Sequence, residues 1–100
     1  MYIIRETEAF RNWLDDLRDH LALARIASRI QQAHTGHFGD CKYIGDGISE
    51  IRIHVSSGYR LYFIRKDHDI VFFLNGGNKS SQNRDIEQAK IIARTLRETP

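Results

Sequence analysis

The chain has 100 residues, of which 41% are hydrophobic and 28% charged, with one proline and seven glycines. This composition predicts a single globular domain over residues 1–100 and excludes disordered and collagen-like chains. The formal net charge of +2 divides into −2 for residues 1–50 and +4 for residues 51–100. This division argues against a generic polycation and leaves two interpretations, a local basic site or an ordinary surface that is rich in arginine.

The first half of the chain predicts a strand at 2–5 and then two helices. Thr7 is suited to cap a helix that runs to about Arg18, because its hydroxyl can accept a hydrogen bond from an orphan amide, and Asp19 can cap the second helix. Gly36 marks the end of that helix, and the short joint at 19–20 predicts an antiparallel helical hairpin. The predicted apolar stripes are Phe10, Trp13, Leu14 and Leu17, then Leu23, Ile26, Ala27 and Ile30.

From Lys42 onward the hydrophobic pattern has a period of two residues. It predicts strands at 42–45, 48–55, 59–66 and 69–75, and their short connections imply an antiparallel meander. A last helix begins at Ser80 or Ser81, and its predicted buried stripe is Ile86, Ala89, Ala93 and Leu96. The fold class is therefore α+β, with two helices first, a sheet after them and a C-terminal helix.

Two of the predicted strands place several polar side chains on one face. A three-residue loop at 56–58, with Gly58 in the left-handed conformation, keeps the odd-numbered apolar residues on a common face. The predicted cross-strand pairs are Val55 with Tyr59, Ile53 with Leu61, Ile51 with Phe63, His54 with Arg60, and Arg52 with Tyr62. The polar face then carries Glu50, Arg52, His54, Arg60 and Tyr62.

This polar face predicts an anion site. Opposed side chains are about 4.5–5.5 Å apart at Cβ, so two arginines and a histidine repel one another, and Glu50 offsets only part of that repulsion. A phosphate group would relieve it, since arginine matches phosphate with two parallel hydrogen bonds. The alternative is that Arg52 pairs with Glu50 while the other side chains point into water.

The segment GGNKSS at 76–81 follows a strand and precedes a helix. Its glycines allow backbone amides to approach a ligand closely, and Lys79 stands at a helix N-terminus, which favours anions. The P-loop pattern GxxxxGK[ST] is absent. The alternative is a plain strand-to-helix turn capped by Ser80 or Ser81.

Other features predict no metal, cofactor or membrane association. His34 and His37 lack a Cys or acidic partner at metal-ligand spacing. No apolar run approaches the roughly 20 residues of a membrane helix, and residues 1–10 do not resemble a signal peptide. The single cysteine cannot form a disulfide within the chain, which fits a reducing compartment. We therefore expect a cytoplasmic protein.

Several segments together resemble the RelE/ParE superfamily of bacterial toxins, and more narrowly its HigB-like branch of addiction module killer proteins. They are GDCKYIGDGISEIRIH at 39–54, GYRLYF at 58–63, IVFFLNGGNKSSQ at 70–82 and DIEQAK at 85–90, with FRNWL and RIASRI earlier in the chain. The resemblance covers nearly all of the sequence. It implies an N-terminal helical hairpin packed on a curved antiparallel β-sheet, with a C-terminal helix.

The resemblance also implies the toxin of a type II toxin-antitoxin system. Many members cut messenger RNA in the ribosomal decoding site, whereas ParE-like members inhibit DNA gyrase. The implied partners are mRNA on the ribosome and a HigA-like helix-turn-helix antitoxin, with the chain a monomer alone or part of a toxin-antitoxin hetero-oligomer. We expect a ribosome-dependent, metal-independent endoribonuclease, a hydrolase that arrests translation. The alternatives are a gyrase inhibitor that acts by protein contact, or an inactive binding-only relative.

The matched motifs imply a set of site residues. Glu50, Arg52, Arg60, Tyr62 and Lys79 agree with the family pattern, while His54 rests on the strand register described above. The expected RNA contacts are Lys42, Arg65 and Arg84.

Their roles follow from the chemistry of RNA cleavage. The cations that stabilise the charge developing on phosphorus are Arg52, Arg60 and Lys79. His54 transfers protons. Glu50 either orients Arg52 or acts as the base, and Tyr62 either stacks on a base or donates a proton. No tyrosine follows Lys79, so the identity of the general base stays open.

Overall fold

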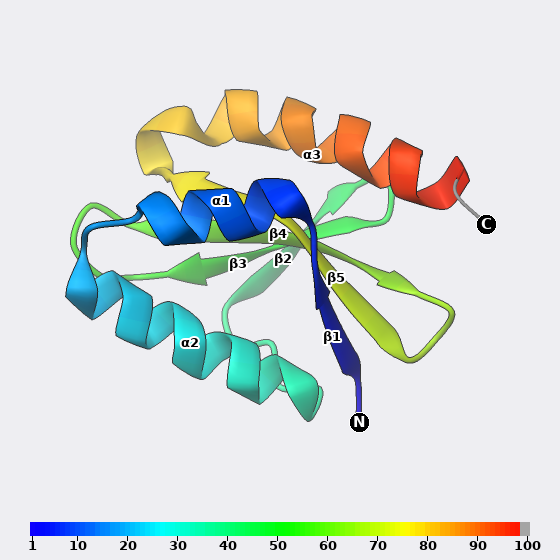
Figure 1. The fold of residues 1–100 in the computed structure, drawn as a ribbon, viewed down its shortest axis with the longest axis horizontal. Coiled ribbons are helices and arrows are strands. Elements are labelled where there is room, and N and C mark those ends of the chain that lie inside the picture. Colours follow the sequence, from blue (N-terminus) through cyan, green and yellow to red (C-terminus); the bar gives the residue numbers. More distant parts are fainter. Residues whose placement is uncertain (99–100) are drawn as a thin grey trace.

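The computed structural model describes residues 1–98, which form a five-stranded sheet with helices on both faces (Figure 1). The elements are β1 (Ile3–Glu6), α1 (Glu8–Asp16), α2 (His20–His34), β2 (Cys41–Gly45), β3 (Ile48–Ile53), β4 (Tyr59–Lys66), β5 (Ile70–Asn78), a 3-10 turn (Lys79–Ser81) and α3 (Gln82–Glu98). The strand order is β1-β5-β4-β3-β2, with β1 parallel to β5 and the other neighbours antiparallel. The expected α+β architecture is confirmed. Within residues 1–98, no helix is both long and apolar enough to span a membrane.

The predicted caps hold the two N-terminal helices in place. The Thr7 hydroxyl accepts a hydrogen bond from the Phe10 amide at 3.1 Å, and the Asp19 carboxylate accepts one from the Ala22 amide at 3.0 Å. Gly36, with φ of 88°, follows the end of α2, and its amide donates to the carbonyl of Ala33. Local sequence signals therefore set both helix starts and the end of α2.

The stripe that α2 turns toward the sheet agrees with the predicted one at Ile26 and Ile30 and differs from it elsewhere. Ala22, Ile26 and Ala33 are buried, whereas Ala27 is exposed. Ala27 instead lines an apolar hollow of about 480 Å³, together with residues of α1 and α2. The reason is that small side chains at the contact allow the helix axis to lie close to the sheet, so the alanines at 22 and 33 face it.

The strands divide the interior into two cores because successive side chains point to opposite faces. The core beneath α1 and α2 includes Ile51, Ile53, Leu61 and Phe63. The core beneath α3 includes Ile48, Tyr62, Ile64, Leu74, Ala89 and Ala93. Figure 1 shows strands of the sheet between α2 and α3. A register shift between Tyr62 and Phe63 leaves Leu74 as an extra residue of β5.

The pairing of β3 with β4 is displaced by two residues from the predicted register. Ile53 lies opposite Tyr59, Arg52 opposite Arg60, and Glu50 opposite Tyr62. The predicted pairs across this hairpin, including His54 with Arg60, are therefore wrong. The connection spans residues 54–58 instead of 56–58, with Ser56 and Gly58 at φ of 54° and 87°. A shift of two residues moves no side chain to the other face, so the polar face keeps its predicted members within the two strands.

Strand β5 is longer than predicted and includes both glycines of the GGNKSS segment. Gly76 lies opposite Leu61 and Gly77 opposite Arg60. The turn after the strand is capped by Asn78, whose side chain accepts hydrogen bonds from the amides of Ser80 and Ser81. The predicted serine cap is therefore wrong, because the asparagine before the lysine already satisfies these amides.

Gly76 makes room for Trp13, which predicts a specific cost for a side chain at this position. A Cβ on Gly76 would lie 2.4 Å from Cζ3 of Trp13, so we expect Gly76→Ala to lower the free energy of unfolding by about 1–3 kcal/mol. Thermal and urea unfolding would measure this. In the Trp13→Leu background the same substitution should cost much less. Equal losses of unfolding free energy in both backgrounds would show that the Trp13 ring is not the reason why position 76 needs a glycine.

Candidate functional site

A small hollow lies where β3 ends, β4 begins and the chain leaves β5. Its volume is about 150 Å³, and the lining residues are Arg52, Ile53, His54, Gly58, Tyr59, Arg60 and Lys79. We call it the cationic hollow. It unites four of the six predicted catalytic residues, namely Arg52, His54, Arg60 and Lys79. None of the lining residues carries a carboxylate.

The two arginines of the hollow share one buried carboxylate. Arg52 and Arg60 are direct cross-strand neighbours. Arg52 Nε lies 3.2 Å from Glu50 Oε1, and Arg60 Nε lies 3.7 Å from Glu50 Oε2. Glu50 is 2% exposed. One negative charge thus faces two positive charges, so the group keeps a net positive charge beside the hollow.

Glu50 is held from a third side by α3. Gln82 Nε2 donates a hydrogen bond to Glu50 Oε2 at 3.4 Å. Both carboxylate oxygens therefore have partners, and neither belongs to the lining of the hollow. Of the two roles expected for Glu50, this arrangement supports the orienting one, because a buried and fully engaged carboxylate is poorly placed to take a proton from a ligand.

Tyr62 lies in the core and not in the hollow. Its side chain is fully buried beneath α3, and burial, followed by the nearby charges of Glu50 and Asp85, raises the pKa of its hydroxyl. The expectation that Tyr62 stacks on a base or donates a proton there does not fit this structure. The reason is that α3 covers this part of the sheet, which the strand pattern does not reveal.

His54 follows β3 and projects into solvent, with 74% of its side chain exposed. Its Nε2 lies 2.5 Å from Asp40 Oδ2, and this hydrogen bond lowers the pKa of the Asp40 carboxyl below its usual value. The main-chain oxygen of Asp40 accepts a hydrogen bond from the Arg52 amide at 2.9 Å. Asp40 is a site residue that sequence reasoning missed, and only its position just before β2 could have suggested it.

Lys79 reaches the hollow from the turn after β5. Its amide donates to the carbonyl of Gly58 at 3.3 Å, which joins this turn to the β3–β4 connection. The preceding glycines do not line the hollow. The space beside them is taken by the side chains of Trp13 and Asp85, so their predicted role of exposing amides to a ligand is not supported.

The three expected RNA contacts lie in different places. Lys42 is exposed on β2 opposite Glu50. Arg84 lines a second hollow of about 450 Å³ that shares Lys79 with the first. Arg65 does not join them, because its guanidinium carbon lies 4.7 Å from the ring centre of Phe38 on the side of α1 and α2. The odd position of Arg65 along β4 directs it to that face.

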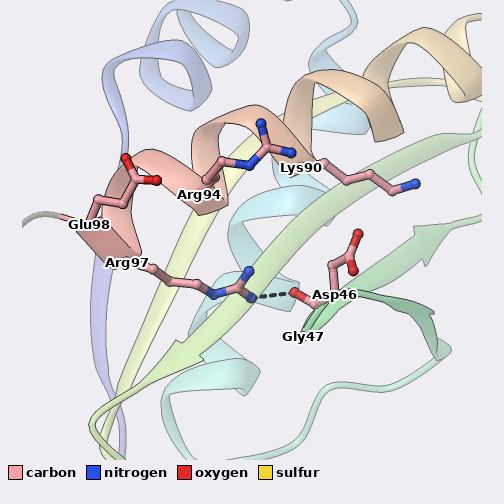
Figure 2. A pocket seen from close by; sticks show the side chains of 6 residues that line it. All are labelled: Asp46, Gly47, Lys90, Arg94, Arg97 and Glu98. Carbon is pink, nitrogen blue, oxygen red and sulfur yellow. Dashed lines mark hydrogen bonds between the residues drawn. The ribbon is translucent and has the colours of Figure 1, made fainter.

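Another basic hollow lies between the C-terminal half of α3 and the β2–β3 turn (Figure 2). Its volume is about 490 Å³, and its lining is Asp46, Gly47, Lys90, Arg94, Arg97 and Glu98. Arg97 donates to the main-chain oxygen of Asp46, and Lys90 forms an ion pair with Glu87 at 3.6 Å. Two carboxylates in its lining oppose the cations, so the cationic hollow is the better candidate for an anion site.

Comparison with known proteins finds a matching family model and a related protein. The model of a family described as phage-derived Gp49-like proteins matches residues 12–97. An uncharacterized protein of Haemophilus influenzae is 43% identical over 93 residues, which cover 93% of this chain and 94% of that protein.

Solved structures of RelE toxins share the fold. The isolated Escherichia coli RelE toxin aligns with a TM-score of 0.66 and 17% identity, covering 88% of this chain and 98% of that one. A chain of the intact E. coli RelBE toxin-antitoxin complex aligns with a TM-score of 0.65 and 20% identity, covering 78% and 96%. A chain of the Mycobacterium tuberculosis RelBE2 toxin-antitoxin complex gives 0.63 and 22%, covering 78% and 98%.

The buried position of Glu50 between two arginines predicts that the protein loses much of its stability when this carboxylate loses its charge. We expect Glu50→Gln to lower the free energy of unfolding by about 3–5 kcal/mol, because it leaves two neighbouring guanidinium groups without their buried counter-charge. Urea unfolding would measure the loss. The matched control is Glu87→Gln, which removes an exposed ion pair on α3 and should cost less than about 1 kcal/mol. Equal effects of the two substitutions would contradict the central role of Glu50.

The Asp40–His54 contact predicts a measurable titration. The pKa of Asp40 is lowered from 3.8 in the folded chain, so its contribution to stability is present above that value and is lost as the pH falls through the lower, folded pKa. A carboxyl-detected NMR titration should show this low pKa. In His54→Ala it should rise toward the ordinary value, since the hydrogen bond is gone. An unchanged Asp40 titration would mean that the contact does not form in solution.

Proposed function

We propose that this chain, which belongs to the family of phage-derived Gp49-like proteins and has the RelE fold, is the toxin of a type II toxin-antitoxin system and that it cleaves messenger RNA. The observation that carries the proposal is the cationic hollow, where Arg52, Arg60 and Lys79 converge. This arrangement fits a phosphate group as its ligand, because one guanidinium group can donate two parallel hydrogen bonds to two phosphate oxygens. The negative charge of the phosphate also relieves the repulsion between the two arginines.

The proposed reaction uses the ribose 2′-hydroxyl as the nucleophile and no metal ion. Its oxygen attacks the adjacent phosphorus, the bond from phosphorus to the 5′-oxygen breaks, and the products are a 2′,3′-cyclic phosphate and a 5′-hydroxyl. Extra negative charge develops on the phosphate oxygens in the transition state. Arg52, Arg60 and Lys79 stabilise this charge, and Glu50 holds the two arginines in place for it.

Proton transfer is assigned to His54. Its side chain is exposed at the edge of the hollow, and its ring pairs with Asp40. In this proposal Asp40 orients the imidazole and stabilises its protonated form, while the other ring nitrogen takes the proton of the 2′-hydroxyl. The departing 5′-oxygen takes a proton from water, which reaches the exposed side of the hollow.

The substrate is proposed to be mRNA on the ribosome. A chain with a net charge of +2 neutralises few phosphates, so it binds free RNA weakly and gains from a surface that presents the message. Lys42 and Arg84 are the proposed additional contacts to the RNA backbone. Arg65 is left out of this set because it lies on the other face of the sheet.

A cognate antitoxin is the proposed protein partner. Two of the similar structures are chains of toxin-antitoxin complexes, which supports a pair of this kind. The resemblance to the HigB-like branch favours a HigA-like antitoxin with a helix-turn-helix domain. Both partners then act in the cytoplasm, where the message is translated.

Arg60 is the residue on which this function should depend most strongly. We expect Arg60→Ala to lower the rate of RNA cleavage by about 100-fold or more, because it removes a charged donor from the developing phosphate charge. Arg60→Lys keeps the charge but loses the paired donors, so it should recover only part of the rate. Arg25→Ala, on the exposed side of α2, is the control and should cleave normally.

The measurement is expression of the chain alone in bacteria, with mapping of mRNA 5′-ends in translated messages and in the same messages lacking a start codon. Cuts confined to translated messages would support ribosome-dependent cleavage. Growth arrest with intact messages and a DNA-damage response would instead identify a gyrase inhibitor. An absence of growth arrest from a well-expressed chain would identify a binding-only protein. Unchanged toxicity of folded Arg60→Ala would contradict the site assignment.

A further inference from the structure

A second carboxylate is buried on the α3 side of the sheet, outside the cationic hollow. Asp85 lies in the first turn of α3 and is 6% exposed. Its carboxylate rests directly on Gly77, because a Cβ placed there would lie 1.7 Å from Asp85 Oδ2. Ser81 Oγ donates a hydrogen bond to this oxygen, and Asn75 Nδ2 donates to the Asp85 main-chain oxygen at 2.9 Å. Asp85 therefore fastens the start of α3 to β5.

The segment fastened in this way carries two groups that belong to the site. Lys79 lines the cationic hollow, and Gln82 donates to Glu50 at 3.4 Å. Both lie within six residues before Asp85. Gly77, on which Asp85 rests, is the direct cross-strand neighbour of Arg60. A movement of Asp85 away from Gly77 would thus displace Lys79 relative to the arginines. It would also displace Gln82, which donates the hydrogen bond to Glu50.

We propose that Asp85 is a positioning residue of the cationic hollow and acts through the contact of its carboxylate with Gly77. The inference rests on the proposed function, in which Lys79 stabilises the charge of the reacting phosphate. Electrostatic attraction does not explain a carboxylate at this place, because a negative charge near the hollow disfavours an anionic ligand. The geometry does explain it, since its contacts fix the turn that carries Lys79. The glycine is required because a side chain at 77 would occupy the place of the carboxylate.

Two substitutions separate the geometry of Asp85 from its charge. Asp85→Asn removes the charge but keeps the shape and the hydrogen bond with Ser81, whereas Asp85→Ala removes both. If Asp85 acted only through its charge, both substitutions would tighten the binding of an anion. A positioning role predicts that Asp85→Ala weakens anion binding several-fold, while Asp85→Asn leaves it unchanged or tighter.

The first test is an NMR titration of the full chain with inorganic phosphate at low ionic strength. Phosphate binding by Asp85→Ala at least as tight as that of the wild-type chain would overturn the inference while leaving the proposed anion site intact. Failure of the wild-type chain to bind phosphate would overturn the proposed site, and with it the role of Asp85 toward that site. Ser81→Ala is a milder variant for the case in which Asp85→Ala does not fold, and it should weaken binding in the same direction.

The second test measures RNA cleavage in a double-mutant cycle with Lys79. We expect Asp85→Ala to lower kcat by about 100-fold, as a displacement of about 1 Å at a reacting group can do. Once Lys79 is replaced by alanine, the Asp85 substitution should have little further effect on kcat. Multiplicative losses in kcat from the two substitutions would show that Asp85 acts independently of Lys79 and would overturn its role in positioning that lysine.

Discussion

One buried carboxylate organises the polar face of this sheet. Glu50 is shielded from water beneath α3, and a carboxylate in that position is stable only when its desolvation is offset by nearby cations and hydrogen-bond donors. Arg52 and Arg60 supply this compensation. Because one carboxylate compensates two guanidinium groups incompletely, positive charge remains at the surface of the hollow. The same requirement that stabilises the fold thus prepares a place for an anionic ligand.

Helix α3 completes this arrangement from above the sheet. It covers Tyr62, donates to Glu50 through Gln82 and seats Asp85 on Gly77. The double glycine serves the packing of both faces, since Gly76 accommodates Trp13 and Gly77 accommodates Asp85. The lysine after it therefore has a defined position relative to the arginines. The catalytic proposal and the packing of the helix depend on the same short segment.

Charge is distributed over the fold in a way that agrees with the proposed substrate. The half of the chain that contains α1 and α2 carries a net −2, and the half that contains β4, β5 and α3 carries +4. The cationic hollow draws all of its cations from residues 52–79. A negatively charged RNA would consequently be attracted toward this end of the sheet.

The sequence by itself determined the helix caps at Thr7 and Asp19, the order of the elements and the set of polar side chains on one face, because capping and strand alternation are local properties. It could not determine the register of the β3–β4 hairpin, since displacement by two residues preserves both faces. The tertiary structure alone also decided three further features. They are the burial of Tyr62, the hydrogen bond between Asp40 and His54, and the contact of Asp85 with Gly77. Each of these contacts joins side chains of different elements, and no local pattern in the sequence records which side chains such elements bring together.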